Sequence, residues 1–188
     1  NIYVIQPDGY ANFSELRKEN YNFDNSDFEM FLSNSGFKLY QNFRSNYYST
    51  LSSNTSMFSM KHHYYSNPKK YSNELAKSRE IIAGENPVVS TFKKNGYKTF
   101  FMMSHPYLIV NRPEIVYDYC NINYDEISYF CKGFEVYKDI AGEIETLIDG
   151  NTSTSNFFFI EQISPGHIVN SKSQSKGKEL ERIDNLTS

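Results

Sequence analysis

Residues 87–103 read PVVSTFKKNGYKTFFMM, and this stretch decides the fold class. Pro87 suits the first turn of a helix, because proline has a helical φ angle and no amide hydrogen is needed there. Asn95 and Gly96 form a helix stop, since both residue types adopt the left-handed backbone that ends helices. The apolar run at 97–103 follows at once and predicts a strand. A helix, a stop and an apolar strand in this order indicate a crossover between parallel strands, so we expect a sheet that is parallel at its centre.

Two other apolar runs supply strands to the expected sheet. Residues 2–5 read IYVI and are followed closely by Pro7, and residues 157–160 read FFFI behind a polar loop. Short apolar runs that are bounded by turn residues are typical of buried strands. Residues 37–43 alternate loosely between apolar and polar, which predicts a further strand or an extended segment.

Helices are expected where apolar residues recur at helical spacing or where cap residues precede them. The expected helices are 25–34, one that begins at or just before Thr50 with Ser49 as its N-cap, 73–82, 87–95, and 126–147 with an interruption at Gly133. With the strands, they predict an α/β fold with a mainly parallel sheet flanked by helices. We expect one domain over residues 1–170, then a polar linker and the start of a helix over 171–188.

The composition limits the class of protein. The chain has 188 residues, of which 39% are hydrophobic and 22% are charged, and it is long enough for one substantial core. A net charge of -3 and a pI near 5.8 provide no basic surface, so no nucleic-acid partner is expected. No apolar run reaches the roughly 18 to 20 residues of a membrane span. The sequence starts inside a strand at Asn1, which we interpret as an excised start behind an upstream anchor. Cys120 and Cys131 leave both a disulfide and two buried thiols open.

A carboxylate and a hydroxyl-rich run are the candidate functional groups. Asp8 comes just after Pro7 at the end of the first expected strand segment, and residues 44–59 read RSNYYSTLSSNTSMFS, with Thr50 at the expected helix start. A carboxylate at the carboxyl edge of a strand and a hydroxyl nucleophile at the start of a helix are what metal-assisted phosphoryl or sulfuryl transfer needs. Each residue also has an ordinary explanation, because Asp-Gly pairs form turns and hydroxyl side chains cap helices.

Three stretches resemble the sulfatase-like hydrolases and transferases of the alkaline phosphatase superfamily. Residues 2–10, IYVIQPDGY, resemble the first strand and metal loop of that family. Residues 50–59, TLSSNTSMFS, are similar to the nucleophile helix of its phosphoethanolamine transferase branch, in which a threonine precedes Met-Phe-Ser by the same interval. Residues 23–37 resemble the helix between these two motifs. The likeness covers most of residues 1–60.

The resemblance implies a role for each matching residue. Asp8 would be the first ligand of a divalent metal, which could be zinc, calcium, magnesium or manganese. Thr50 would be the catalytic nucleophile and would also contact the metal. The residues expected to bind the substrate are Asn46, His105 and His167.

One departure from the family concerns the metal site. The family completes that site with a later Asp-His pair, and these 188 residues contain no such dipeptide. Because four or more donors are normally needed to hold a dication tightly, we expect weak metal binding by this chain alone. The resemblance therefore implies the amino-terminal part of an alkaline phosphatase-like domain, incomplete at its carboxyl end.

Two functions follow as expectations. The first is metal-dependent phosphoester or sulfoester hydrolysis or transfer, acting on an anionic small molecule, lipid or polysaccharide substituent of a cell envelope. Relatives with these motifs commonly face the periplasm or the exterior of a bacterial membrane. The alternative is a catalytically incomplete α/β domain that binds a carbohydrate or a protein. An aromatic content of 16% suits carbohydrate stacking, although buried aromatic residues are also ordinary in protein cores.

Overall fold

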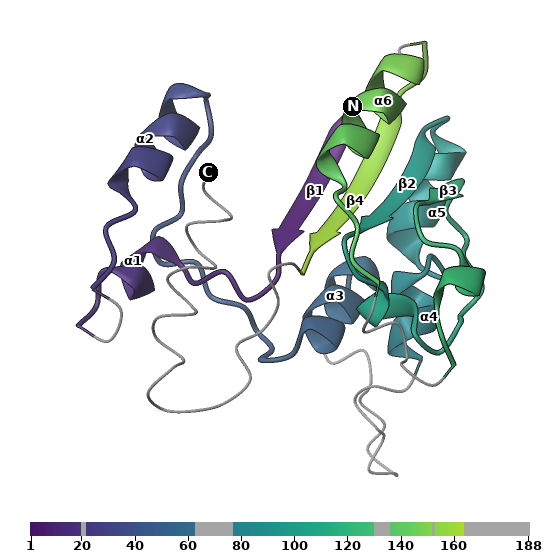
Figure 1. The fold of residues 1–188 in the computed structure, drawn as a ribbon, viewed down its shortest axis with the longest axis horizontal. Coiled ribbons are helices and arrows are strands. Elements are labelled where there is room, and N and C mark those ends of the chain that lie inside the picture. The colour runs from purple at the N-terminus through teal and green to yellow at the C-terminus, as the bar shows by residue number, and fades with distance from the viewer. Residues whose placement is uncertain (20–21, 63–76, 130–135, 152, 164–188) are drawn as a thin grey trace. The chain divides into compact units, whose positions relative to one another are not determined.

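Four strands form one parallel sheet in the computed structural model of the chain (Figure 1). The structure describes residues 1–19, 22–62, 77–129, 136–151 and 153–163. The strands are β1 (Ile2–Pro7), β2 (Lys98–Met103), β3 (Tyr119–Cys120) and β4 (Asn156–Gln162). Their order across the sheet is β1-β4-β2-β3, so β2 and β4 are central. The expected α/β class with a parallel sheet is confirmed.

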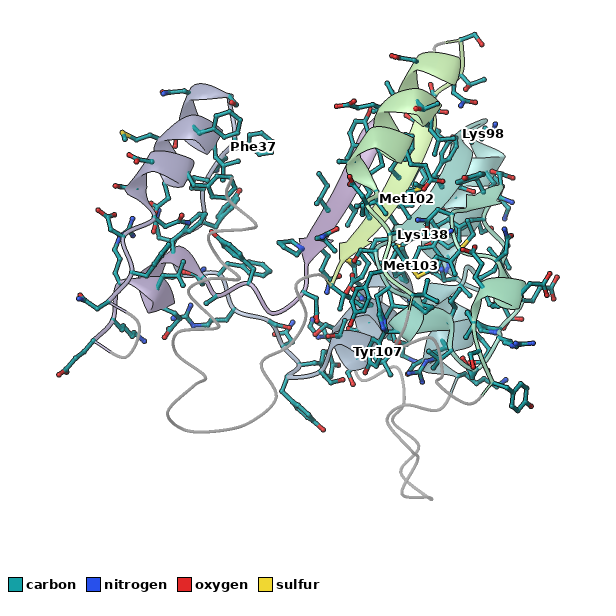
Figure 2. The ribbon with its side chains drawn as sticks, viewed as in Figure 1. Phe37, Lys98, Met102, Met103, Tyr107 and Lys138 are labelled. Atoms are coloured by element: carbon teal, nitrogen blue, oxygen red, sulfur yellow. The ribbon has the colours of Figure 1, made fainter. Side chains whose placement is uncertain are left out.

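The pairing of β2 with β4 creates two apolar faces. Phe100 pairs with Phe158, and Phe101 pairs with Phe159. Successive side chains of a strand point to opposite faces, so each face receives every second residue. On one face the rings of Phe100 and Phe158 stack with centroids 4.4 Å apart. Met102 and Met103, both labelled in Figure 2, belong to different clusters for the same reason.

Helices cover both faces of the sheet. Those of the sheet unit are α3 (Thr50–Phe58), α4 (Ser78–Ile82), α5 (Pro87–Lys94) and α6 (Ala141–Gly150), with short 3₁₀ turns η1 (Pro106–Ile109) and η2 (Tyr124–Glu126). The first three helices pack against the face that carries Phe101 and Phe159. The other face is covered by α6, through Ile144, Leu147 and Ile148, and Figure 1 shows this helix in front of the strands.

The crossover that was expected from residues 87–103 is confirmed. Pro87 is the first residue of α5, and the Asn86 side chain caps this helix by accepting a hydrogen bond from the backbone of Val89 at 2.8 Å. Gly96 has a φ angle of +78°, a conformation that glycine adopts without the strain of a side chain. The chain then enters β2 two residues later.

Other expectations were wrong or only partly met. Of the helix expected over 126–147, the described part is helical only from Ala141; Ile127 is extended, with a ψ angle of 104°, and ends the short η2 turn. Residues 130–135, with the expected interruption at Gly133, lie outside the described part of the chain. Residues 37–43 form no strand; they are irregular and include a turn. The helix expected over 73–82 is present as α4, which is shorter, and residues 73–76 lie outside the described part of the chain, as does the tail after 170.

The described residues group into two compact units. The first contains the sheet and its helices and comprises residues 1–6 and the described part of 46–163. The second comprises the described part of 7–45, with α1 (Phe13–Leu16) and α2 (Ser26–Asn34). Asn25 is the N-cap residue of α2 without a side-chain capping bond, and Gly36, just past the end of this helix, has a φ angle of +87°. No helix in the described part of either unit has the length and apolar character of a membrane span.

Candidate functional site

The hydroxyl-rich run of residues 44–59 contains the whole of α3, which begins at Thr50 as the sequence predicts. Thr50 is the first residue of the helix, and Ser49 is its N-cap with an extended backbone. The hydroxyl oxygen of Ser49 accepts a hydrogen bond from the backbone amide of Ser52 at 3.1 Å. The Ser49 hydroxyl in turn lies 3.0 Å from that of Ser52. Thr50 therefore occupies a fixed position in the first helical turn.

The start of α3 is electrostatically suited to an anionic group. The first turn of a helix presents backbone amides and the positive end of the helix dipole. No acidic residue lies in the first turn of α3. Thr50 is half-buried, so its side chain is partly open to the surroundings. A phosphate or sulfate group beside Thr50 would consequently be attracted by the helix and not repelled by a neighbouring carboxylate of that turn.

The body of α3 is anchored in the core. Phe58 packs edge-on against Phe159 of β4 with ring centroids 4.7 Å apart, and Figure 1 shows α3 at the arrowhead end of that strand. Leu51 belongs to the same apolar cluster. Inside the helix, the Thr55 hydroxyl donates to the carbonyl oxygen of Leu51 at 2.6 Å. This packing makes α3 a rigid support for Thr50.

Asn54 is a polar residue that the sequence reasoning missed. Its side chain is 1% exposed, and its amide nitrogen has no hydrogen-bond partner among the described residues. Buried donors of this kind are rare in folded proteins and need a structural or functional explanation. Asn54 lies four positions after Thr50 and hence on the same side of the helix. The spacing places Asn54 on the side of Thr50, but its burial depends on how α3 packs on the sheet.

Buried polar residues also lie where β2 and β4 end. The backbone amide of Ser104 donates to the carbonyl oxygen of Glu161 at 3.0 Å, and the hydroxyl oxygen of Ser104 accepts from the amide of Ile163 at 2.8 Å. Ser104 and Glu161 are fully buried. These two hydrogen bonds extend the pairing of β2 with β4 at the carboxyl edge of the sheet.

His105 follows β2 at this edge and is 4% exposed. Its Nδ1 accepts a hydrogen bond from the backbone amide of Tyr107 at 3.1 Å, so a neutral His105 carries its proton on Nε2. The ring of Tyr137 lies 5.1 Å from the His105 ring, measured between centroids. His105 is thus the N-cap of η1 as well as a candidate for substrate binding.

Asn121 is a second residue that the sequence reasoning missed, and its role is structural. Its side-chain oxygen accepts from the amide of Met103 at 2.8 Å, and its side-chain nitrogen donates to the carbonyl oxygen of Met103 at 2.9 Å. The Asn121 side chain therefore makes the two hydrogen bonds to Met103 that the backbone of another β3 residue would make. The Lys138 ammonium group donates to the Asn121 carbonyl oxygen at 2.7 Å, and both Lys138 and Met103 are labelled in Figure 2.

The other predicted site residues have different surroundings. Asp8 follows β1, is 7% exposed, and precedes Gly9, which has a φ angle of +70°. Asp8 belongs to the second unit, whereas Asn46, Thr50 and His105 belong to the first. Asn46 is exposed. His167 lies outside the described residues.

The described residues do not by themselves fit a tightly held metal ion. Among them, no group of three or more His, Cys, Asp or Glu side chains is placed to bind one. Because a tightly bound dication needs more donors than Asp8 provides, we assign no chemical step to a metal here. Cys120 is a free thiol, and burial raises the pKa of this thiol above its usual value. A protonated thiol is a poor nucleophile, so no catalytic role is proposed for Cys120.

Comparisons with protein-family models, with curated proteins and with solved structures find no match for this chain.

Proposed function

We propose that this protein transfers a phosphoryl or sulfuryl group through the hydroxyl of Thr50. It would act as a metal-dependent ester hydrolase or transferase similar to sulfatases and to phosphoethanolamine or phosphoglycerol transferases. The observation that most supports this proposal is the position of Thr50 as the first residue of α3, directly behind the Ser49 cap. The hydroxyl, the backbone amides and the positive end of the helix dipole are all found at this point.

The proposed reaction has two displacement steps. In the first, Oγ1 of Thr50 attacks the phosphorus or sulfur atom, and the bond from that atom to the leaving oxygen breaks. The Thr50 proton passes to the leaving group or to water. In the second, water or an acceptor hydroxyl attacks the Thr50 ester, which restores the Thr50 hydroxyl and releases the product. Splitting the reaction in this way replaces one difficult step by two easier ones.

Other residues of the first unit support the first step. The Ser49 cap holds the helix start in place, and the absence of an acid from that turn lets an anionic group approach. Asn46 is exposed four residues before Thr50, where it can contact the substrate. His105, whose Nδ1 accepts from the Tyr107 amide, would in its neutral form present its Nε2 proton as the proposed donor for a substrate oxygen or for the leaving group.

The family resemblance implies a divalent cation with Asp8 as a ligand, but Asp8 belongs to the other unit and no metal-binding cluster is found among the described residues. No step of the reaction proposed at Thr50 is therefore assigned to a metal. The substrate class that fits is an anionic ester, on a small molecule, a lipid or a polysaccharide of a cell envelope.

Turnover of aryl esters tests this function. The protein is assayed with p-nitrophenyl phosphate and p-nitrophenyl sulfate, in the presence of zinc, calcium, magnesium or manganese in turn and after chelation. We expect Thr50→Ala to lower kcat by about a thousandfold or more, since it removes the nucleophile. Ser56→Ala is the matched control, because Ser56 is a hydroxyl residue of the same helix whose side chain donates to the Lys61 carbonyl oxygen. Undiminished turnover in Thr50→Ala would exclude Thr50 as the nucleophile.

A further inference from the structure

The second unit contains a hollow of about 450 Å³ with an aromatic wall. Four of the residues that line it are Tyr10, Phe13, Tyr40 and Phe43. The exposed fractions of Tyr40 and Phe43 are 63% and 69%, which is high for aromatic side chains. The volume lies in the range of small-ligand sites, which are mostly apolar with a few polar groups. The role proposed for Thr50 does not involve this hollow.

Hydrogen bonds hold the wall in position. The side-chain amide of Asn12 donates to the carbonyl oxygens of Tyr40 and Phe43, at 3.4 Å and 3.2 Å. The same side chain accepts from the backbone amide of Ser14 at 2.9 Å and so caps α1. Asn12 therefore ties the segment that carries the two exposed rings to the start of a helix.

The inner part of the wall is fixed as well. The phenol oxygen of Tyr10 accepts a hydrogen bond from the side-chain amide of Asn25 at 2.5 Å. Burial raises the pKa of Tyr10 to about 12, so this phenol is neutral in the physiological range. The rings of Tyr10 and Phe13 meet edge to face, with centroids 6.2 Å apart. The hollow thus has a preformed aromatic surface with no charge from Tyr10.

The rim of the hollow carries one charge of each sign. Arg44 and Glu15 both line it and form an ion pair with a nitrogen-to-oxygen distance of 2.7 Å. The Glu15 carboxylate also pairs with Lys18 at 2.7 Å, so these charged groups are already engaged with one another and offer a ligand hydrogen bonds rather than an unpaired charge. A wholly apolar ligand would bury the Arg44–Glu15 pair, so these groups would lose their hydrogen bonds to water and gain none from the ligand. The ligand that fits is neutral, with a flat apolar face and polar groups at its edge.

We propose that this hollow binds a neutral sugar ring of an oligosaccharide. The C–H face of a pyranose ring stacks on Phe43 or Tyr40, as apolar surfaces pack on aromatic faces. Its hydroxyl groups donate to the Glu15 carboxylate and accept from the Arg44 guanidinium. Sugar binding requires no chemistry at Thr50, so an experiment that disproves the proposed function does not disprove sugar binding.

Titration of the full chain with maltotriose, cellotriose and chitotriose tests the proposal, with saturation-transfer NMR to detect binding and calorimetry to measure Kd. We expect at least one of the three to bind. Phe43→Leu keeps an apolar side chain but removes the ring, and we expect it to weaken binding about tenfold. Phe37→Ala is the matched control, because Phe37 is 60% exposed in the same unit but is not one of the residues that line the hollow (Figure 2).

Three results would overturn the proposal. The first is that none of the three oligosaccharides binds at millimolar concentration to a chain with a wild-type circular dichroism spectrum. The second is that Phe37→Ala weakens binding as much as Phe43→Leu does. The third is that glucose 6-phosphate binds more tightly than glucose, which would indicate an anion site.

Discussion

The backbone amide of Ser52 donates a hydrogen bond to the hydroxyl oxygen of Ser49, across 3.1 Å. This bond satisfies one of the amides that the first turn of α3 leaves open, immediately beside Thr50. The same contact therefore stabilises the helix and fixes the position of the proposed nucleophile.

Substitutions of Ser49 distinguish its effect on the stability of α3 from its effect on turnover at Thr50. Ser49→Ala removes the acceptor, and we expect a loss of about 1 kcal/mol in the free energy of unfolding together with lower turnover. Ser49→Asp keeps the cap but places a negative charge where an anionic group would bind. We expect nearly wild-type stability and reduced turnover in that variant, measured by urea denaturation and by aryl ester hydrolysis. Full activity in Ser49→Asp would argue against an anionic substrate at this helix start.

Gly84 is a position where any side chain should be harmful. Its φ angle is +123°, and a β-carbon built on it would lie 2.6 Å from Cβ of Val116. We expect Gly84→Ala to lower the free energy of unfolding by about 2–3 kcal/mol, from the clash and from the strained backbone. Gly142→Ala, where a β-carbon would meet nothing within 4 Å in α6, should instead stabilise the protein by about 0.5–1 kcal/mol. Equal effects of the two substitutions would contradict this packing.

Asn121 should matter for stability because it pairs with both backbone groups of Met103. Asn121→Ala leaves a buried amide and a buried carbonyl without these partners, and we expect a loss of about 2–4 kcal/mol in chemical denaturation. Asn111→Ala changes an exposed asparagine and should cost less than about 0.5 kcal/mol. A small effect of Asn121→Ala would mean that water replaces the side chain at the end of the sheet.

Asp118 provides a prediction about pH. Burial raises the pKa of its carboxyl, but hydrogen bonds from Lys93 and from Thr99 outweigh burial and hold the pKa below its usual value. A carboxyl with a lowered folded pKa adds stability above its unfolded pKa, near 3.9, and this stability is lost as the pH falls through the folded pKa.

We therefore expect Asp118→Asn to lower the unfolding temperature at pH 7, and the difference from wild type to shrink below about pH 4. Thermal denaturation at several pH values measures it. Asp149→Asn, at an exposed position of α6, serves as the control. A difference between wild type and Asp118→Asn that stays constant down to pH 2 would show that the carboxylate charge is not the cause.

Local signals in the sequence predict most of the sheet unit. Pro87, Gly96 and the apolar run after them are sufficient to predict α5 and β2, because the proline, the glycine and the strand each favour one backbone conformation. In contrast, β3 contains only Tyr119–Cys120 and is completed by the Asn121 side chain, so it has no periodicity to detect. Its pairing with β2 depends on tertiary contacts.

The candidate site was predictable to a similar extent. Ser49 and Thr50 were identified because capping is a local property of neighbouring residues. The burial of Asn54 could not be predicted, since it depends on how α3 packs on the sheet. The aromatic hollow was also missed, because Tyr10 and Phe43 are far apart in the sequence and a side chain of Asn12 brings their segments together.

The most direct test of the central claim is mass spectrometry of the protein after an acid quench during aryl ester turnover. Trypsin cleaves after Arg44 and Lys61, so the peptide 45–61 carries Thr50 together with the other hydroxyl residues of α3. We predict a phosphoryl or sulfuryl group on Thr50, located by fragmentation of this peptide and missing from Thr50→Ala. Turnover with the group on another residue, or with no group on Thr50, would contradict the account.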